Sequence, residues 1–328
     1  MVATPQELRA RIQELSNATW TLGVIATLFE SGLAAQLREP RSAEELAAHC
    51  PGLSRGQIER CLAVAASAGV VVAEAARYRL VEGALPLAQE PMLTPLAGEL
   101  RSSLMQPLAL LDAARAPAPV VGWRHTERAL LQAQGDASAG MPPIWKMNVV
   151  PALEGLAERL QRPDARFLDV GVGVGSLAIA ACRTWPQLQV VGLDASEVPL
   201  AIARENVARA GLAARIELRK GTVEQMTDDA GFDLAWLPSV FIAAEVLPGA
   251  LACVRASLRP GGFLLCPVLG SGGLNAQHRA VMLLMNELWG GPVIGTLEAE
   301  TLLQQAGFSN VRTLPAPPGA PGLVAGQR

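Results

Sequence analysis

Closely spaced cysteines and histidines are missing from this sequence. Its five cysteines are far apart, no Cys-x-x-Cys occurs, and none of the three histidines lies at ligand spacing from a cysteine. Zinc sites and disulfide frameworks both depend on such spacings. We therefore expect reduced, mostly buried cysteines and no metal site.

Long apolar runs and charge runs are missing as well. No segment approaches the roughly 20 apolar residues of a membrane span, and the first residues, MVATPQELRARIQEL, lack the apolar centre of a signal peptide. The net charge of −3 argues against nucleic-acid binding, which depends on clustered Lys and Arg. These absences predict a cytoplasmic protein that binds neither membranes nor nucleic acid.

The sequence does contain enough apolar residues for a large core. Of its 328 residues, 50% are hydrophobic and 17% are charged, and this length suggests about two domains. The pattern along the chain divides it into three parts, residues 1–88, 89–161 and 162–328. Each part predicts a different structure.

Residues 1–88 have the pattern of a winged helix. Three segments have helical spacing, LRARIQELSNATWTLGVIATLFESGL, SAEELAAHC and SRGQIERCLAVAASAGV, and VVVAEAARYRLVEGA reads as two short strands about a turn. A DNA-binding domain of this type would present basic side chains on its second helix and wing. Only Arg55, Arg60, Arg77 and Arg79 are available there. We therefore favour a packing or dimerisation role over DNA binding.

Residues 89–161 form a proline-interrupted, amphipathic linker. Trp123, Trp145 and Met147 lie beside helix-breaking residues in it. These side chains either fill the core between two domains or form one wall of an apolar ligand pocket, because pockets favour domain interfaces. The sequence leaves both readings open.

Residues 162–328 alternate strands with helices. Apolar runs of strand length occur in ARFLDVG, LQVVGLD, ARIELRKG, FDLAWLPSV and GGFLLCPVL, and helical segments separate them. Repeated βαβ units predict a parallel sheet with helices on both faces. The last two runs, SNVRTLP and GLVAGQR, are joined by a short turn, which predicts an antiparallel final strand.

The segment FLDVGVGVGSLAIA, residues 167–180, places a glycine-rich turn between a strand and a helix. Gly175 arrives one residue too early for the dinucleotide pattern that begins at Gly171 and Gly173. Asp169 would repel a pyrophosphate but suits a positively charged ligand. Asp194 ends the next strand, near the spacing at which an acidic side chain binds ribose hydroxyls. The pattern predicts an adenosine derivative without phosphates.

These segments resemble the motifs of the class I S-adenosylmethionine-dependent methyltransferases. FLDVGVGVGSLAIA resembles the first motif of the family, VVGLDAS the acidic end of the second strand, FDLAWLPSV the fourth strand, and LRPGGFLL the turn into the fifth. The N-terminal pattern, the helical linker and the phrases ELAAHC, RYRL and LLQQAGF resemble the dimeric small-molecule O-methyltransferases. The resemblance implies a Rossmann-like α/β fold, a seven-stranded sheet with an antiparallel last strand, preceded by a mainly helical winged-helix dimerisation domain.

The resemblance also implies a set of cofactor contacts. Asp169 would lie near the amino group of S-adenosylmethionine, Asp194 would hold the ribose hydroxyls, and Thr222 replaces an aspartate that commonly binds adenine. The complete implied cofactor set is Asp169, Gly171, Gly173, Gly175, Asp194, Ala195, Gly221, Thr222, Val223, Leu237 and Pro238.

The catalytic pair of the plant-type relatives is missing. Their histidine base corresponds to a position near Val240, and its glutamate partner to a position near Cys266 and Pro267. His278 is the candidate replacement, since it lies in the segment that caps the acceptor pocket in relatives. We expect His49 and His125 to be exposed.

The acceptor is expected to be a small hydrophobic molecule. The predicted pocket residues are Trp145, Met147, Phe241, Met282, Met285 and Asn286, with Trp236 and Trp289 nearby, although plain core packing explains some of these equally well.

Loss of the base is compatible with methyl transfer. Positioning is worth effective molarities of about 10⁵ to 10⁸ M, whereas general-base help contributes about 10² to 10⁴-fold. The leading hypothesis is a homodimeric O-methyltransferase that uses proximity. Transfer to carbon or nitrogen, a non-methylating cyclisation or decarboxylation, and a cofactor-sensing DNA-binding regulator remain alternatives.

Overall fold

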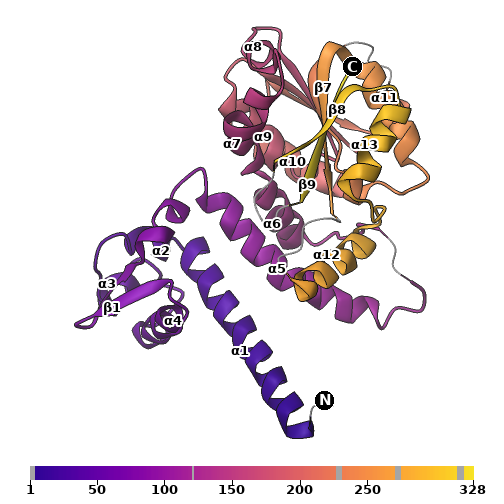
Figure 1. The fold of residues 1–328 in the computed structure, drawn as a ribbon. Helices are drawn as coiled ribbons and strands as arrows, with labels where there is room; N and C mark the ends of the chain where they lie inside the picture. The colour runs from indigo at the N-terminus through magenta and orange to yellow at the C-terminus, as the bar shows by residue number, and fades with distance from the viewer. Residues whose placement is uncertain (1–3, 120–121, 227–230, 270–274, 316–320) are drawn as a thin grey trace. The chain divides into compact units, whose positions relative to one another are not determined.

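The computed structural model describes residues 4–119, 122–226, 231–269, 275–315 and 321–328 (Figure 1). The chain forms two compact units, residues 1–114 and 115–328. The predicted linker, residues 89–161, therefore contributes residues to both units, and its predicted boundaries stay a prediction. None of the described helices combines the length and apolar character needed to cross a bilayer.

The first unit is helical with one small hairpin. Its helices are α1 (Pro5–Glu30), α2 (Leu33–Gln36), α3 (Ala43–Ala47), α4 (Arg55–Ser67) and α5 (Leu93–Ala113), with short 3₁₀ turns at Glu82–Ala84 and Pro86–Ala88. Thr4, Ser42 and Ser54 each cap a helix and form a capping box with the residue three positions later. Strands β1 (Val71–Glu74) and β2 (Arg77–Leu80) pair antiparallel. The predicted helices and hairpin are present.

The second unit contains the large sheet. Its strands are β3 (Arg166–Val170), β4 (Gln189–Asp194), β5 (Ile216–Lys220), β6 (Phe232–Trp236), β7 (Leu258–Val268), β8 (Ser309–Leu314) and β9 (Gly322–Gln327). They lie in the order β5-β4-β3-β6-β7-β9-β8. Strands β3 to β7 are parallel, and β9 runs antiparallel between β7 and β8. The predicted seven-stranded sheet with a reversed last strand is confirmed.

The helices of the second unit follow the predicted alternation. They are α6 (Arg128–Ser138), α7 (Met141–Ile144), α8 (Leu156–Leu160), α9 (Ser176–Thr184), α10 (Glu197–Arg209), α11 (Leu247–Ser257), α12 (Ala276–Trp289) and α13 (Thr296–Gln305). A π-helical turn covers Trp145–Val149, and short 3₁₀ turns cover Val150–Ala152, Val223–Gln225 and Ser239–Phe241.

The sheet has a separate hydrophobic core on each face. Side chains alternate along a strand, so Phe167 and Leu234 join the core that packs against α9 and α10, whereas Leu168 and Ala235 join the core that packs against α11 and α13. Figure 1 shows α9 on one side of the sheet and α11 and α13 on the other. This arrangement leaves the ends of the strands as the places where a ligand can approach.

Strand β7 starts three residues earlier than predicted. Leu258 already pairs with Phe232, and the register then shifts before Leu234 pairs with Phe263. The left-handed Gly261 (φ 76°) accommodates this irregularity. The segment predicted as a turn is therefore a bulged strand entrance.

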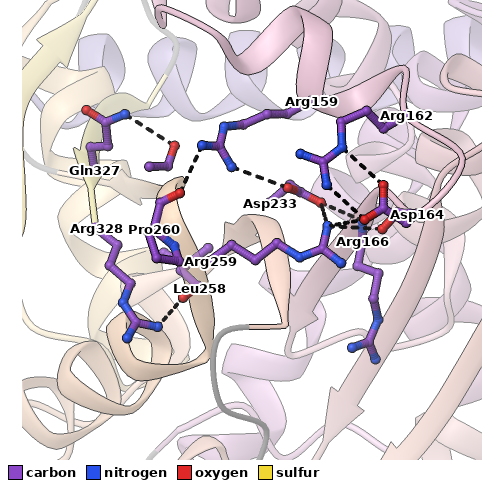
Figure 2. A network of polar contacts seen from close by, with 11 residues as sticks. Arg159, Arg162, Asp164, Arg166, Asp233, Leu258, Arg259, Pro260, Gln327 and Arg328 are labelled. Carbon is purple, nitrogen blue, oxygen red and sulfur yellow. Dashed lines mark hydrogen bonds and ion pairs between the residues drawn. The ribbon is translucent and has the colours of Figure 1, made fainter.

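A buried carboxylate is neutralised at the amino end of the sheet. Asp233, which is fully buried, accepts a hydrogen bond from Arg259 Nη1 at 2.7 Å and from the Arg166 backbone N–H at 3.0 Å. Arg159 Nη1 lies 3.6 Å from its other oxygen. Figure 2 shows both guanidinium groups directed toward this carboxylate.

Candidate cofactor and acceptor site

The glycine-rich turn connects β3 to α9 at the carboxyl end of the sheet. Gly171, Gly173 and Gly175 have φ values of 72°, 55° and 81°, a conformation that side chains disfavour. The Gly171 and Val172 N–H groups both donate to Leu193 O, at 2.8 and 2.9 Å. The turn is thereby fixed against the end of β4, and its three glycines carry no side chain that would keep a ligand from the backbone.

Asp194 fastens the turn to the ends of β4 and β5. Its two carboxylate oxygens accept from the N–H groups of Gly173 and Ser196, each at 2.9 Å, and its carbonyl accepts from Gly221 N–H at 2.9 Å. Burial raises the pKa of Asp194, and the two backbone hydrogen bonds oppose that rise. The predicted positions Gly173, Asp194 and Gly221 therefore lie together.

Asp169 is the unbalanced group of the site. Its side chain is 1% exposed, and its Oδ2 atom has no hydrogen-bond partner among the described residues. Burial, with a smaller contribution from the negative charge of Asp194, raises the pKa of Asp169 to about 8. A buried carboxyl of this kind gains free energy from a cationic hydrogen-bond donor.

The other predicted cofactor residues border the same turn. Leu237 is buried and donates from its N–H to Leu265 O at 3.1 Å, and Pro238 Cγ lies 3.8 Å from the position that a Gly171 Cβ would take. Val223 is buried, whereas Ala195 and Thr222 are exposed. Thr222 caps the 3₁₀ turn at Val223–Gln225, so the residue at the usual aspartate position has a structural role here.

Helix α6 braces the glycine turn, a role that the sequence reasoning missed. A Cβ on Gly135 would stand 2.2 Å from Val174 Cγ2, so α6 lies directly against the turn. Ser176 Oγ donates to Asp136 of α6 at 2.9 Å. From the neighbouring helix α10, Asn206 Nδ2 donates to Val174 O of the turn, also at 2.9 Å. Gly135 followed by Asp136 inside a helix was the available signal, because an interior glycine usually marks a close approach.

An aromatic cluster lies beyond the end of β6. Phe241 stacks on Trp289 with ring centroids 4.9 Å apart, and Trp123 meets Phe241 edge-on at 5.4 Å. Met282 and Met285 of α12 pack against the same cluster. Three of the six predicted pocket residues, Phe241, Met282 and Met285, are therefore brought together.

The other three predicted pocket residues lie elsewhere or in a different setting. Trp145 is 1% exposed and packs against Trp236 in the sheet core, with the ring centroids 4.9 Å apart. Its Nε1–H has no hydrogen-bond partner among the described residues. Met147 is 66% exposed. Asn286 is fully buried on α12, next to Met285 in sequence.

The positions of the missing catalytic pair hold no base. Val240 is a buried aliphatic side chain, and burial raises the pKa of Cys266 to about 11, although hydrogen bonding with Ser239 opposes the rise. His278 is half-buried, and its Nε2 atom is buried without a described partner. Cys266 remains a neutral thiol at neutral pH, so it does not substitute for a carboxylate.

The three histidines lie in three different environments. His49 is exposed, as expected. The expectation for His125 was wrong, because its ring is half-buried and lies 4.5 Å from Trp123 at the rim of the aromatic cluster. Burial lowers the pKa of His125, and Glu127 partly opposes that effect.

The described residues contain no group of three or more His, Cys, Asp or Glu side chains arranged to hold a metal ion. Within the same residues all five cysteines are free thiols.

This sheet order, together with a carboxylate-fronted glycine turn at the carboxyl ends of the strands, defines the fold of the class I methyltransferases. Residues 167–262 match the family model described as "Methyltransferase domain". The chain therefore contains a methyltransferase domain, and the resemblance inferred from its motifs is confirmed.

Similar proteins agree on the domain and differ in what they act on. Ribosomal protein L11 methyltransferase of Symbiobacterium thermophilum is 35% identical over 136 residues, covering 42% of this chain and 41% of its own length. A 3-hydroxy-5-methyl-1-naphthoate 3-O-methyltransferase of Streptomyces sahachiroi is 31% identical, covering 49% and 48%. The chain spans less than half the length of these two curated relatives.

A solved structure extends the similarity to the whole fold. Human N-acetylserotonin methyltransferase, in complex with S-adenosylmethionine, superposes with a TM-score of 0.65 at 18% identity, covering 100% of this chain and 99% of that one. At this identity the comparison shows the fold, including the helical N-terminal unit.

Proposed function

We propose that this chain is an S-adenosylmethionine-dependent methyltransferase that acts on a small hydrophobic acceptor. The observation that carries the proposal is Asp169, a buried carboxyl at the mouth of a glycine turn, one oxygen of which has no hydrogen-bond partner in the part of the chain that the structure describes. Such a group suits a ligand with a cationic amino donor and disfavours a pyrophosphate.

The residues present fit this cofactor. Asp169 would accept a hydrogen bond from the amino group of S-adenosylmethionine, and Asp194 would accept from its ribose hydroxyls. The backbone of the glycine turn would lie along the part of the cofactor between these two groups. Trp145 packs on Phe167, which shares the sheet face of Asp169. Its indole N–H has no partner among the described residues and could donate to the carboxylate of the cofactor. When bound, the cofactor supplies a methyl group already activated on a sulfonium.

The chain's own contribution is positioning. Val240 and Cys266 hold the family's base and orienting positions, and neither removes a proton from the acceptor, because valine does not ionise and burial raises the pKa of the Cys266 thiol to about 11. Alignment alone can supply the larger part of the acceleration. We propose transfer to the oxygen of an acidic hydroxyl group, in line with the naphthoate O-methyltransferase among the relatives. Transfer to carbon or nitrogen is the alternative.

The first unit is proposed to form a homodimer interface. On α1, Leu8, Ile12, Leu15 and Trp20 are apolar and between 46% and 76% exposed. A second copy of the chain would bury such a surface.

DNA binding by the same unit is less well supported. The wing arginines Arg77 and Arg79 lie within 4 Å of Glu45 and Glu74. Arg55 of α4 lies 3.7 Å from Glu44. These carboxylates reduce the positive charge available to phosphate groups.

The test of the proposed function is calorimetry followed by product analysis. We expect the purified protein to bind S-adenosylmethionine and to show no binding of nicotinamide or flavin nucleotides. Incubation with a panel of phenols should yield S-adenosylhomocysteine in equal amount to a product heavier by one CH₂ group. A converted substrate with an unchanged cofactor would instead support the non-methylating alternative. Binding of a dinucleotide in preference to the sulfonium would refute the proposal.

A further inference from the structure

Trp123 packs against two separate groups of apolar side chains. The first group consists of three buried aliphatic side chains, Leu131, Val174 and Ile202. The second is the aromatic cluster beyond β6, where the indole meets Phe241 and Trp289 edge-on, with ring centroids 5.4 and 6.3 Å apart. Among the residues that the structure describes, Trp123 is the side chain that belongs to both groups.

The first group includes the middle of the glycine turn. Val174 stands between the left-handed Gly173 and Gly175 and is 1% exposed. Its side chain is fixed against Gly135 of α6, and its carbonyl accepts a hydrogen bond from α10. On this side, Trp123 therefore packs against a fixed surface that includes the turn predicted to hold the cofactor.

The backbone that carries Trp123 is held as well. A Cβ on Gly290 would stand 2.6 Å from Gly122 Cα, so the backbone before Trp123 lies directly against the end of α12. Helix α6 begins shortly after Trp123, at Arg128, and its other end lies against the turn. A tryptophan side chain has only two torsions. The indole therefore keeps the turn and the aromatic cluster at a spacing that its own width defines.

The aromatic cluster has surface left for a ligand. Trp123, Phe241, Met282 and Met285 are only half-buried, although they pack against buried side chains. Aromatic ligands bind to such apolar surfaces through buried area and ring packing. An aromatic acceptor that covers these side chains would lie against a residue whose other contacts reach the glycine turn.

We propose that Trp123 is a positioning residue for methyl transfer, a rigid spacer that sets the distance between an aromatic acceptor on the cluster and a cofactor at the glycine turn. The proposal rests on the proposed function and goes beyond it, because it assigns Trp123 to alignment and not to the affinity for either ligand. In the transfer, an oxygen lone pair of the acceptor forms the O–CH₃ bond, the electrons of the S–CH₃ bond return to sulfur, and the proton of the acceptor passes to water. Reacting atoms must lie about 3–3.5 Å apart, and a displacement of about 1 Å can cost about 100-fold in rate.

The first measurement compares turnover with binding in Trp123→Phe and Trp123→Leu, two steps of decreasing side-chain size, on the full chain. Turnover is followed with S-adenosylmethionine and 1-naphthol, and calorimetry gives the Kd of S-adenosylhomocysteine and of 1-naphthol in its presence. We expect kcat to fall about tenfold in Trp123→Phe and about 100-fold in Trp123→Leu, while both Kd values stay within about threefold. Trp289→Leu is the matched control, because Trp289 belongs to the aromatic cluster and not to the group at the turn. It should weaken 1-naphthol binding at least as much as it lowers kcat.

The second measurement does not depend on turnover. 1-Methoxynaphthalene has no hydroxyl group to be methylated, so it can be bound together with S-adenosylmethionine that carries an isotope-labelled S-methyl group. With the unaltered protein we expect a nuclear Overhauser effect between the S-methyl protons and the naphthalene protons. The effect should be weaker in Trp123→Phe and absent in Trp123→Leu, with both ligands still bound.

Three results would overturn the proposal: no such effect in the unaltered protein with both ligands bound, an effect that persists in Trp123→Leu, or a loss of affinity as large as the loss of kcat. Failure of both naphthalenes to bind a protein that has bound the cofactor would also overturn it, because the cluster would then not be the acceptor surface. If 1-naphthol binds without being methylated, or if Trp123→Leu does not fold, the Overhauser effect in the unaltered protein and in Trp123→Phe decides the matter. Failure of the proposed function would instead appear as absence of S-adenosylmethionine binding.

Discussion

Two buried carboxyl groups lie at opposite ends of the same sheet and have opposite surroundings. Asp233, at the amino end, is held by Arg259, by Arg159 and by a backbone N–H (Figure 2). Both groups have one oxygen without a hydrogen-bond partner among the described residues, Oδ1 of Asp233 and Oδ2 of Asp169. Two arginines lie against Asp233, whereas Asp169 has no ion pair within that part of the chain. The missing positive charge, and not burial or an unpaired oxygen by itself, therefore distinguishes the carboxyl that suits a cationic ligand.

Asp233→Ala should give the largest effect on stability. It removes the partner of two arginines and leaves their charges partly buried, which typically costs about 3–5 kcal/mol. Urea unfolding should show this loss, while the folded fraction keeps its affinity for S-adenosylmethionine. A loss of affinity without a loss of stability would contradict the structural role of the amino-end carboxylate.

Asp194→Ala should give the largest effect on binding. The variant loses a charged acceptor for two ribose hydroxyls, each contact worth about 1.5–3 kcal/mol, so the affinity for S-adenosylmethionine should fall by at least about 100-fold. Calorimetry measures this loss, and the circular dichroism spectrum should remain that of the unaltered protein. Unchanged affinity would refute the ribose assignment.

Asp169→Asn should weaken cofactor binding while leaving the stability of the protein nearly unchanged. At neutral pH the raised pKa keeps most of the carboxyl protonated in the free protein, so an amide should change the free energy of unfolding by less than about 1 kcal/mol. The cofactor should bind about tenfold more weakly, because its amino group loses an ionic acceptor. A large loss of stability would mean that Asp169 resembles Asp233 after all.

The pH dependence of Asp169 gives a sharper form of the same test. Its pKa is about 8 in the folded protein, well above the ordinary 3.8 of an aspartate, so the folded state holds the proton more tightly. The contribution of Asp169 to the free energy of unfolding is fully present below about pH 4 and is lost as the pH rises through about 8. Cofactor affinity should therefore increase from about pH 6 to pH 7.5, by up to tenfold per unit, because the cation favours the ionised form. In Asp169→Asn, neither the free energy of unfolding nor the cofactor affinity should show this dependence on pH.

Arg162→Ala should have no measurable effect on stability or binding. Arg162 pairs with Asp164 at 2.8 Å near the amino-end carboxylate, but both side chains are exposed to solvent. Urea unfolding in parallel with Asp233→Ala provides the matched control. A shifted midpoint would indicate that the exposed pair belongs to the buried network.

The strands and the glycine turn could be predicted from sequence because their determinants are local. FLDVGVGVG contains both the apolar strand and the left-handed glycines, and Asp194 ends its own strand. The brace by α6 could not be predicted, because the Ser176–Asp136 contact joins residues 40 positions apart. The same holds for His125, whose burial depends on Trp123 and on the packing around it. Side-chain orientation, as at Asn286, is decided by tertiary contacts that periodicity does not encode.

The brace also limits how this domain can be isolated. The segment matched by the family model begins at residue 167, whereas Gly135 and Asp136, which lie against the glycine turn, are more than 30 residues upstream. A fragment cut at the family boundary would keep every glycine and both acidic side chains of the turn. It would still lose the helix that supports them, so expression of the catalytic half alone should start before Arg128.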